Sequence, residues 1–544
     1  MQNIGIIVGG AAGEGSKKAG HLIAKLFNAH KLRIFIHEDY GSVIKGGHNF
    51  SHICISKEEK NATSKKIDFL LALNAQTVEK HKDKIKKSGL LICDEGIGEV
   101  DYPEDKTVKI PLSSIVSEAG GIPLMKNTAL VCGFAKIMGV KWEKLEEVLR
   151  RELKKDTEKN IEVAKLAYEK TETQKSFKEG EGEVLPLVSG NQAAAIGALY
   201  AGLENYFAYP MTPSTGVLVY LSAIEGVRTF QPESEIAVVT AGLASAYAGK
   251  RTMIGTSGGG FALMTEGVSF SAISETPITI IMSQRLGPAS GVPTYQSQGD
   301  LLFVLNSGQG DMMRFVVTPG DADETCYLTG KAVNIAWKYQ MPSIVLLDKE
   351  LSENTYNLKG EYKIEKEEAL LAEDSVDYNR YDGEDVSPLL FPGGEGIVKT
   401  TSYEHDKKGI STEEAEEISA MSEKRMRKYE KLKEELKEME VVKTYKKGKT
   451  AVIFWGSVKG PVMEATKNLD VKLVQIMVAQ PLLEEEVKKA LEGVKKVICV
   501  EENATGQMAQ VLNAHGIKVD EKILKYDGRP FTIEEIKKRI KDKL

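Results

Sequence analysis

The segment Tyr209-Pro-Met-Thr-Pro-Ser-Thr215 follows an apolar run, Asn205-Tyr-Phe-Ala208, and contains two prolines on either side of Thr212. Proline fixes φ and disfavours helix in the residue before it, so we expect a strand that ends in a rigid turn. Ser214 or Thr215 is placed to cap a following helix, and Thr212 presents its hydroxyl at the carboxyl end of the strand. Open α/β sheets bind ligands at that edge. A prolyl turn with a capping hydroxyl and no ligand is the alternative that this segment alone leaves open.

The composition is that of a globular protein. The chain has 544 residues, of which 42% are hydrophobic and 28% are charged, and this length predicts about three or four domains. A formal net charge of −6 argues against nucleic acid as a general partner. We find no apolar run of the ~18 residues that a membrane-spanning helix needs, and no signal peptide at the start, so we expect a cytoplasmic protein.

The cysteines are spread along the sequence and form no Cys-x-x-Cys pair. They are Cys54, Cys93, Cys132, Cys326 and Cys499. Iron–sulfur clusters and Cys-rich zinc sites need several thiolates close together, so we expect neither within this chain. The cysteines are instead predicted to be small buried hydrophobic residues in a reducing compartment.

Short apolar runs alternate with helical stretches over most of the chain, which predicts an α/β protein made of several three-layer, parallel-sheet domains. We place the domains at residues 1–176, 185–360 and 446–544. A polar linker is expected at 177–184, and a connecting segment at 361–445. This connecting segment is predicted to contain a long helix over 411–439, opened by a capping box of Ser411 and Glu414.

Three further features of the middle domain lie at the ends of expected elements. Glu235 stands at the start of a helix rich in small residues, where the helix dipole favours a carboxylate. Thr256-Ser-Gly-Gly-Gly260 follows a strand, and its glycines allow close approach of the backbone to a ligand. Arg285 follows the next strand in a loop stiffened by two prolines, where a guanidinium suits a carboxylate. Taken singly, each feature also fits a structural role as a helix start, a common turn or an ion-pair partner.

Four patterns occur in this order in the middle domain: Tyr-Pro-x-Thr-Pro-Ser, Ser-Glu before a helix of small residues, Thr-Ser-Gly-x-Gly, and Arg-x-Gly-Pro-x-x-Gly-x-Pro-Thr. Together they resemble the pyrimidine-binding domain of the alpha subunit of 2-oxoacid:ferredoxin oxidoreductases. Residues 1–176, with Tyr40-Gly-Ser-Val-Ile-Lys-Gly-Gly-His48, resemble the gamma module of the family, here fused in front. The tail, with Trp455-Gly-Ser457 and Glu501-Glu-Asn503, resembles a transketolase C-terminal domain.

The resemblance implies roles for five residues of the middle domain. Glu235 corresponds to the catalytic glutamate that hydrogen-bonds the pyrimidine N1′ of thiamine diphosphate, and Pro210 and Thr212 to its neighbours in the cofactor site. Thr212 and Arg285 also correspond to residues that hold the substrate carboxylate, and Thr294 to a further pocket residue.

The implied reaction is the oxidative decarboxylation of a 2-oxoacid with coenzyme A to acyl-CoA, carbon dioxide and reduced ferredoxin. The fused arrangement favours 2-oxoglutarate or a broad range of 2-oxoacids over pyruvate alone. The gamma module is expected to act as a lid that contributes to coenzyme A binding, with Gly46, Gly47 and His48 as candidate contacts.

The second half of a thiamine diphosphate site is missing from the sequence. The usual Gly-Asp-Gly with a later Asn does not occur, because Gly310-Asp311 continues to Met312 and Gly320-Asp321 to Ala322. We therefore expect a beta subunit to supply the diphosphate site, Mg²⁺ and a [4Fe-4S] cluster, in an alpha–beta or (alpha–beta)2 assembly. The chain alone is expected to be inactive.

Two other interpretations stay open at this point. Gly10-x-x-Gly13-x-Gly15 follows the first strand, and Glu38 and Asp39 end the next, as in a nicotinamide dehydrogenase. The glycine order differs from G-x-G-x-x-G, however. A non-catalytic scaffold subunit is the other alternative, and it is disfavoured because Thr212, Glu235 and Arg285 are all present.

Overall fold

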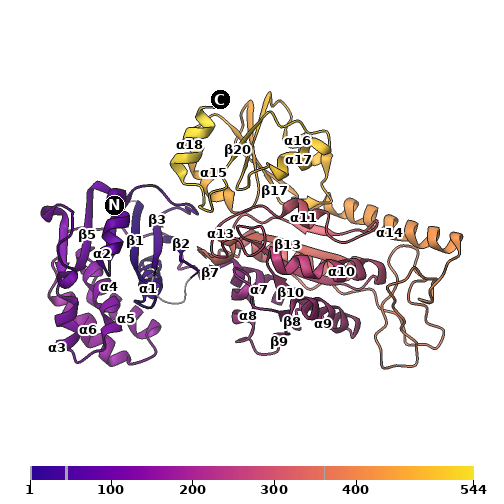
Figure 1. The fold of residues 1–544 in the computed structure, drawn as a ribbon, viewed down its shortest axis with the longest axis horizontal. Coiled ribbons are helices and arrows are strands. Elements are labelled where there is room, and N and C mark those ends of the chain that lie inside the picture. Colours follow the sequence, from indigo (N-terminus) through magenta and orange to yellow (C-terminus); the bar gives the residue numbers. More distant parts are fainter. Residues whose placement is uncertain (1–2, 43–46, 361) are drawn as a thin grey trace. The chain divides into compact units, whose positions relative to one another are not determined.

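The computed structural model describes residues 3–42, 47–360 and 362–544. The chain forms two compact units. The first unit comprises Met1–Val188, Asn354–Lys359 and Thr532–Lys538, and the second comprises Ser189–Glu353, Gly360–Phe531 and Arg539–Leu544. Helices and strands alternate through both units, which confirms the α/β class (Figure 1). Among the described residues, no helix combines the length and the apolar character that crossing a membrane demands.

The first unit is built on one sheet of eight strands. In spatial order they are β6 (Thr107–Ile110), β5 (Ile85–Asp94), β4 (Ile67–Ala72), β1 (Asn3–Ala11), β3 (His48–Ser56), β2 (Arg33–Asp39), β14 (Thr355–Asn357) and β7 (Leu187–Ser189). The helices of this unit are α1 (Ser16–Ala29), α2 (Ala75–His81), α3 (Leu112–Glu118), α4 (Lys126–Ile137), α5 (Trp142–Glu152) and α6 (Thr157–Glu169).

Successive side chains of β1 enter two different cores, as the period of two in a strand requires. Ile6 and Val8 pack in the large core, which also takes side chains of α1, α4, α5 and α6. Ile7 points to the opposite face, where Val78 of α2 covers it. The first unit therefore has helices on both faces of its sheet.

The sheet of this unit is parallel over only part of its width. β6, β5, β4 and β1 pair in parallel, but β1 with β3 and β3 with β2 are antiparallel. The connection between Asp39 and His48 is shorter than the dozen or more residues that a parallel crossover needs, so β2 and β3 form a hairpin-like pair. β14 is also antiparallel to β2, with Thr355 opposite Ile36. This strand belongs to the first unit, although the predicted boundary at 360 placed it in the middle domain.

The second unit contains a seven-stranded sheet that carries the sequence motifs. Its strands in spatial order are β18 (Val478–Gln480), β12 (Phe315–Val317), β13 (Pro342–Asp348), β11 (Ile278–Gln284), β10 (Thr252–Thr256), β8 (Asn205–Ala208) and β9 (Arg228–Phe230). All of the pairings except that of β18 with β12 are parallel. The associated helices are α7 (Gly190–Tyr200), α8 (Thr215–Leu221), α9 (Glu235–Tyr247), α10 (Gly258–Ser274), α11 (Leu301–Leu305), α12 (Ala322–Tyr339) and α13 (Lys349–Glu353).

A five-stranded sheet completes the second unit. Its order is β15 (Val442–Tyr445), β17 (Lys472–Ile476), β16 (Thr450–Phe454), β19 (Lys496–Glu501) and β20 (Glu521–Leu524), and only β15 is antiparallel to its neighbour. The helices here are α15 (Lys459–Ala465), α16 (Glu484–Ala490) and α17 (Gln507–Ala514), whereas the residues of α18 (Ile533–Lys541) are divided between the two units.

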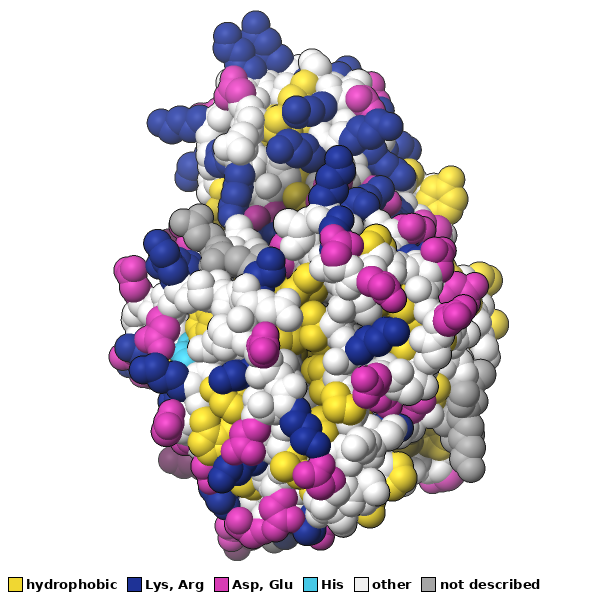
Figure 2. Space-filling view, turned by 90° about the vertical axis from the view of Figure 1, so that its left-hand side faces the viewer, with side chains coloured by type: hydrophobic (Ala, Val, Ile, Leu, Met, Phe, Trp, Pro, Cys, Tyr) yellow, Lys and Arg dark blue, Asp and Glu magenta, His cyan; other side chains and the backbone are white. Residues whose placement is uncertain are grey.

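The five-stranded and seven-stranded sheets share one hydrophobic core. Trp455 and Met508 pack in the same cluster as Leu301 and as residues of α9 and α10. The short strand β18 also leaves the five-stranded part to pair with β12. Residues 446–544 carry 19 Lys and Arg against 14 Asp and Glu, although the whole chain is acidic, and Figure 2 shows basic side chains gathered over this C-terminal part.

The long helix of the connecting segment, α14 (Ala415–Leu436), is shorter than expected at both ends. The predicted capping box is wrong. Glu414 is the N-cap residue and its side chain makes no capping hydrogen bond, while Ser411 forms an isolated bridge with His405. This bridge holds Ser411 in extended backbone, away from the helix start.

A buried ion cluster fastens α14 to the end of α10. Glu275 has no exposed surface, and its two carboxylate oxygens accept hydrogen bonds from Lys424 at 2.6 Å and Lys428 at 2.9 Å. Burial alone would raise the pKa of Glu275, but the charges of Lys428 and Lys424 outweigh it and hold that pKa well below its usual range.

We predict that Glu275→Gln destabilises the second unit by about 3–5 kcal/mol, because two buried ammonium groups lose their counter-charge. Urea denaturation of the full chain measures the effect. Because folding lowers the pKa of Glu275, its ionised form stabilises the folded chain fully at neutral pH. The difference in free energy of unfolding between wild type and Glu275→Gln therefore becomes smaller below about pH 4.3. Glu485→Gln, which removes an exposed pair with Lys488, should leave the midpoint unchanged. Equal midpoints for Glu275→Gln and wild type would contradict the prediction.

Candidate active site at the edge of a parallel sheet

The candidate residues lie where three neighbouring parallel strands end. β8, β10 and β11 are adjacent in the seven-stranded sheet and end at Ala208, Thr256 and Gln284. Because parallel strands have their carboxyl ends at the same edge, the loops that follow them lie side by side. These loops carry Thr212 and Arg285, together with the glycine run at 258–260.

Thr212 and Arg285 are joined directly. Nη1 of Arg285 donates a hydrogen bond to the backbone oxygen of Thr212 at 2.8 Å. Thr212 is half-buried and Pro210 beside it is exposed. The predicted cap of α8 is wrong: Ser214 has helical backbone angles, and its hydroxyl donates back to the oxygen of Met211 at 2.9 Å. A capping hydroxyl needs an extended N-cap residue, which this tight turn does not provide.

Glu235 is the first residue of α9, as expected. Ser234 before it is extended and caps the helix by accepting a hydrogen bond from Ala237 N at 3.3 Å. The side chain of Glu235 is buried, with 6% of its surface exposed, yet no hydrogen bond or ion pair to its carboxyl group is found among the described residues. Buried polar groups are nearly always paired, so a carboxyl in this state is prepared for a ligand.

Two glycines make room beside acidic side chains at this edge, Gly260 beside Glu235 and Gly258 beside Asp300. A Cβ on Gly260 would lie 2.8 Å from Oε1 of Glu235, and a Cβ on Gly258 would lie 2.7 Å from Oδ2 of Asp300. The hydroxyl of Ser257 is buried in the same place without a partner among the described residues. The backbone N–H groups at the start of α10 lie next to the same space, and the helix dipole gives this end of α10 a partial positive charge.

The sequence interpretation missed Asp300, whose charge acts on Arg285 although no ion pair within 4 Å joins these two described side chains. Burial lowers the pKa of Arg285, and the charge of Asp300 acts against that shift. Burial raises the pKa of Asp300 to about 6, although Arg285 opposes it. Nε of Arg285 is buried without a hydrogen-bond partner among the described residues. The signal for Asp300 was its place just before the apolar run 301–305, which fits an N-cap as well as a site residue.

Thr294 lies on the same loop as Arg285 and is 5% exposed. The loop closes on itself, because the N–H of Leu286 donates to the oxygen of Tyr295 at 3.0 Å and the N–H of Val292 donates to the oxygen of Leu286 at 2.9 Å. This closure brings the two ends of the loop together. The closure therefore holds a guanidinium and a threonine side chain on one compact loop at the carboxyl end of β11.

The candidate residues of the first unit are only partly described. Gly46 lies outside the described residues, Gly47 has a φ of 74°, and His48 begins β3. Nε2 of His48 lies 2.7 Å from Nε2 of His81. Burial lowers the pKa of both rings, that of His81 to about 3, so this is a neutral pair at physiological pH.

Glu38, the acid of the nicotinamide alternative, is buried inside the first unit. Its Oε2 accepts a hydrogen bond from Ser51 Oγ at 2.8 Å, and Oε1 lies 3.0 Å from Nε2 of His21. A ribose-binding acid must face the ligand at the end of its strand. Glu38 instead serves a contact within the fold, which weakens that alternative.

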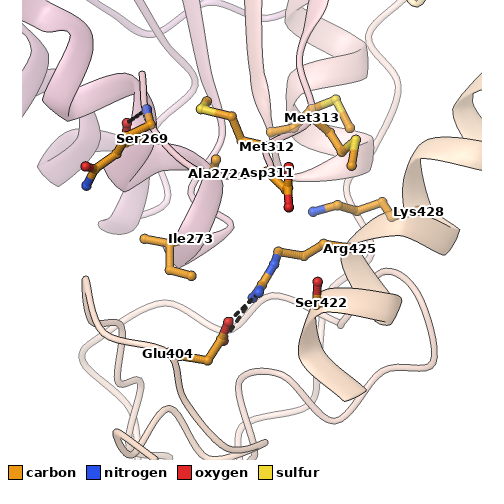
Figure 3. Close-up of a pocket in the computed structure, with 13 residues that line it drawn as sticks. Ser269, Ala272, Ile273, Asp311, Met312, Met313, Glu404, Ser422, Arg425 and Lys428 are labelled. Atoms are coloured by element: carbon orange, nitrogen blue, oxygen red, sulfur yellow. Dashed lines mark hydrogen bonds and ion pairs between the residues drawn. The ribbon is translucent and has the colours of Figure 1, made fainter. Parts of the chain in front are cut away.

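A cavity of about 270 Å³ lies at the other end of α10, away from these residues. Ala272, Met312 and Ser422 are among the residues that line it (Figure 3). Its two cations are already paired, Arg425 with Glu404 at 3.1 Å and Lys428 with Glu275. The cavity is a gap beside the buried ion cluster and offers none of the features of the sheet edge.

Two family models match the chain. Residues 196–424 match "pyruvate flavodoxin/ferredoxin oxidoreductase, thiamine diphosphate-binding", and residues 5–170 match "pyruvate ferredoxin/flavodoxin oxidoreductase". The first of these includes all of the candidate residues of the sheet edge.

Similarity to named proteins extends over the whole length. The alpha subunit of the 2-oxoacid:ferredoxin oxidoreductase of Saccharolobus solfataricus is 29% identical over 98% of this chain and 97% of its own. The 2-oxoglutarate synthase subunit KorA of Methanocaldococcus jannaschii is 29% identical over 65% of this chain and 98% of its own.

The structure is similar to a solved one over its full length. The 2-oxoglutarate:ferredoxin oxidoreductase of Magnetococcus marinus, solved with 2-oxoglutarate, coenzyme A and succinyl-CoA bound, has a TM-score of 0.89 at 28% identity and covers 100% of this chain and 99% of its own. The resemblance expected from the four motifs is confirmed. Both family models, the full-length relatives and the solved structure agree, so this chain belongs to the 2-oxoacid:ferredoxin oxidoreductases.

Proposed function

We propose that this chain is the alpha subunit, with a gamma domain fused in front, of a thiamine-diphosphate-dependent 2-oxoacid:ferredoxin oxidoreductase. The reaction is the oxidative decarboxylation of a 2-oxoacid with coenzyme A, which yields acyl-CoA, carbon dioxide and reduced ferredoxin. The observation that carries this proposal is the buried Glu235, whose carboxyl group lies beside Gly260 and has no hydrogen-bond partner among the described residues. It lies within the part of the chain that matches a thiamine diphosphate-binding family.

The residues at the sheet edge fit the pyrimidine half of thiamine diphosphate. When bound, the cofactor supplies an electron sink for the decarboxylation of a 2-oxoacid. Glu235, the proposed catalytic residue, accepts a hydrogen bond from the pyrimidine N1′ and holds the ring in its reactive protonation state. Gly260 leaves the space next to that carboxyl group free of a side chain, and Gly258 does the same beside Asp300. Pro210 and Thr212 shape the wall opposite.

The substrate is held by a different set of groups. Arg285 already binds the backbone oxygen of Thr212 through Nη1, and its buried Nε has no hydrogen-bond partner among the described residues. We assign this guanidinium to the carboxylate of the 2-oxoacid. Guanidinium groups bind carboxylates through two parallel hydrogen bonds, which fixes the orientation of the keto group. We assign the hydroxyls of Thr212 and Thr294 to the same pocket.

The surface beside Glu235 supports a partner subunit. Tyr209, Phe230, Ile236 and Leu263 are 39%, 47%, 56% and 51% exposed. Large apolar residues exposed around a site are typical of an interaction surface. We assign this surface to a beta subunit that supplies the diphosphate site, Mg²⁺ and a [4Fe-4S] cluster and passes electrons to ferredoxin, in an alpha–beta or (alpha–beta)2 assembly.

The remaining assignments rest on the family likeness. We propose that residues 1–176 form the gamma domain, that 185–360 bind the pyrimidine, and that 446–544 form a domain like the transketolase C-terminal domain. Gly46, Gly47 and His48 are proposed to contact coenzyme A. We favour 2-oxoglutarate or several 2-oxoacids as substrates, since the names of the relatives refer to both, and we place the enzyme in the cytoplasm.

The proposal is tested with Glu235→Ala in the chain reconstituted with its partner subunit. We expect kcat for 2-oxoacid oxidation to fall about 10²- to 10⁴-fold, because the group that holds the pyrimidine N1′ is lost. Ferredoxin reduction under anaerobic conditions measures the rate, and the chain without its partner should show no turnover. Glu233→Gln, an exposed acid two residues earlier, is the matched control and should match wild type. Undiminished turnover in Glu235→Ala would leave the chain as a scaffold.

The pair of Arg285 and Asp300 predicts a pH dependence of substrate binding. Asp300 is protonated below its pKa of about 6 and ionised above it. The ionised form competes with the substrate carboxylate for Arg285, so KM for the 2-oxoacid should be about three- to fivefold higher at pH 7.5 than at pH 5.5. In Asp300→Asn, KM should stay low at both pH values, whereas Asp311→Asn, an exposed acid elsewhere, should behave as wild type. The same pH dependence in Asp300→Asn and wild type would refute this role.

A further inference from the structure

The loop that carries Arg285 and Thr294 is held from its downstream end. We call residues 285–295 the substrate loop, a name that rests on the proposed function. It continues into Gln296-Ser-Gln298, in which both glutamine side chains are buried, with 3% and 0% exposed surface. Neither glutamine belongs to the motifs from which the site was predicted.

Gln298 connects three strand ends. Its Nε2 donates to Oδ2 of Asp348, the last residue of β13, at 3.1 Å, and to the backbone oxygen of Trp455, just after β16, at 3.0 Å. Its Oε1 accepts from the N–H of Glu502 at 3.0 Å, after β19, and its own N–H donates to the oxygen of Glu502 at 2.7 Å. Asn503 adds a fifth bond, from Nδ2 to the backbone oxygen of Gln298 at 3.1 Å. Every polar group of this residue is therefore engaged.

The glycine of Trp455-Gly-Ser457 is explained by this contact. Gly456 has a φ of 61°, and a Cβ there would lie 2.4 Å from Nε2 of Gln298. A larger residue at 456 would therefore displace the glutamine side chain. This motif of the C-terminal part receives the end of the substrate loop.

Gln296 makes a second set of bonds to the same region. Its Nε2 donates to Oε2 of Glu502 at 2.6 Å and to Oγ of Ser457 at 3.2 Å. Its Oε1 accepts from the N–H of Glu350 at 3.0 Å, and its own N–H donates to the oxygen of Gly528 at 3.1 Å.

A third contact braces the loop itself. The guanidinium carbon of Arg529 lies 3.7 Å from the ring centre of Tyr295. Gly528 beside it approaches Leu286 and Tyr295, since a Cβ there would lie 3.2 Å and 3.3 Å from their side chains. The segment after β20 therefore rests on both ends of the substrate loop.

We propose that Gln296 and Gln298 are positioning residues that fasten the substrate loop to the C-terminal part of the second unit and so set the affinity for the 2-oxoacid. They act through Arg285 and Thr294 and do not touch the substrate. The proposal gives residues 446–544 a part in substrate binding, although the pocket residues all lie in the middle domain.

The environment explains why amides occupy these positions. Asp348 and Glu502 are both buried, and burial raises the pKa of each. The charge of Asp348 adds to the rise at Glu502, whose pKa reaches about 8. A third carboxylate here would add repulsion, and a bulky cation would not fit beside Gly456. An amide offers donors and an acceptor without charge, and it satisfies the carboxyl oxygens and the backbone N–H groups together.

The test compares Gln298→Leu and Gln296→Leu with wild type in the full chain reconstituted with its partner subunit. We expect KM for the 2-oxoacid to rise about 10- to 100-fold with kcat within about threefold, because a displaced guanidinium weakens binding more than it alters chemistry. Hydrogen–deuterium exchange of the full chain should be faster across 285–295 in both variants. That readout needs no cofactor and no turnover.

Gln475→Leu is the matched control. Gln475 is a fully buried glutamine of β17 that donates to Oε2 of Glu324 at 2.6 Å, and among the described residues it makes no hydrogen bond to the substrate loop. It should lose stability without a change in KM or in exchange across 285–295. An equal rise of KM in this control would show a general loss of packing and would overturn the proposal.

Two other outcomes are decisive. Faster exchange of the loop with unchanged KM would overturn the role in substrate binding. If the wild-type complex oxidises no 2-oxoacid, the proposed function fails, and the exchange rates then decide on the glutamines alone. In that case, faster hydrogen–deuterium exchange across 285–295 in both leucine variants supports the proposal that the glutamines hold the substrate loop. Unchanged exchange rates overturn it.

Discussion

The parallel alignment of β11, β10 and β8 is the constraint on which the site depends. Neighbouring strands lie about 4.8 Å apart, so three successive strands bring the starts of their loops within about 10 Å of one another. Thr212, the glycine run at 258–260 and Arg285 therefore meet without any long excursion of the chain. α9 needs only to begin at the same edge for Glu235 to join them. The backbone fixes the geometry, and the side chains then have little freedom left to lose when a ligand binds.

The sequence predicted those residues of the site whose positions are marked by a local pattern in the neighbouring sequence. Strand ends, glycine turns and the first residue of α9 carry local signals, so Thr212, Glu235 and Arg285 could be placed at one edge. Gln298 could not, because its partners Asp348 and Glu502 are distant in sequence and nothing local marks them. The antiparallel pairing in the first unit was predictable from its short connection. The start of α14 was not, since the bridge at Ser411 depends on tertiary structure.

The second unit buries carboxyl groups in two different ways. Glu275 is paired with two lysines and keeps its charge, and these ion pairs hold α14 in place. Asp348 and Glu502 are paired with amides and backbone N–H groups instead, and their pKa values are raised. In the second arrangement, neutral hydrogen-bond donors and no added counter-charge satisfy the buried carboxyl oxygens. This arrangement holds the downstream end of the substrate loop.

The exposed apolar residues beside Glu235 offer a physical reason for the proposed site to need two subunits. Glu235 is almost fully covered by its own chain, yet Phe230, Ile236 and Leu263 around it remain about half exposed. Water near these residues screens the carboxyl group and weakens its hydrogen bond to a bound ring. A partner that covers the apolar rim removes this water, and the same interaction then becomes stronger without any movement of Glu235. Under the proposed function, assembly and activation are thus one event, because the surface that binds the partner is also the wall of the site.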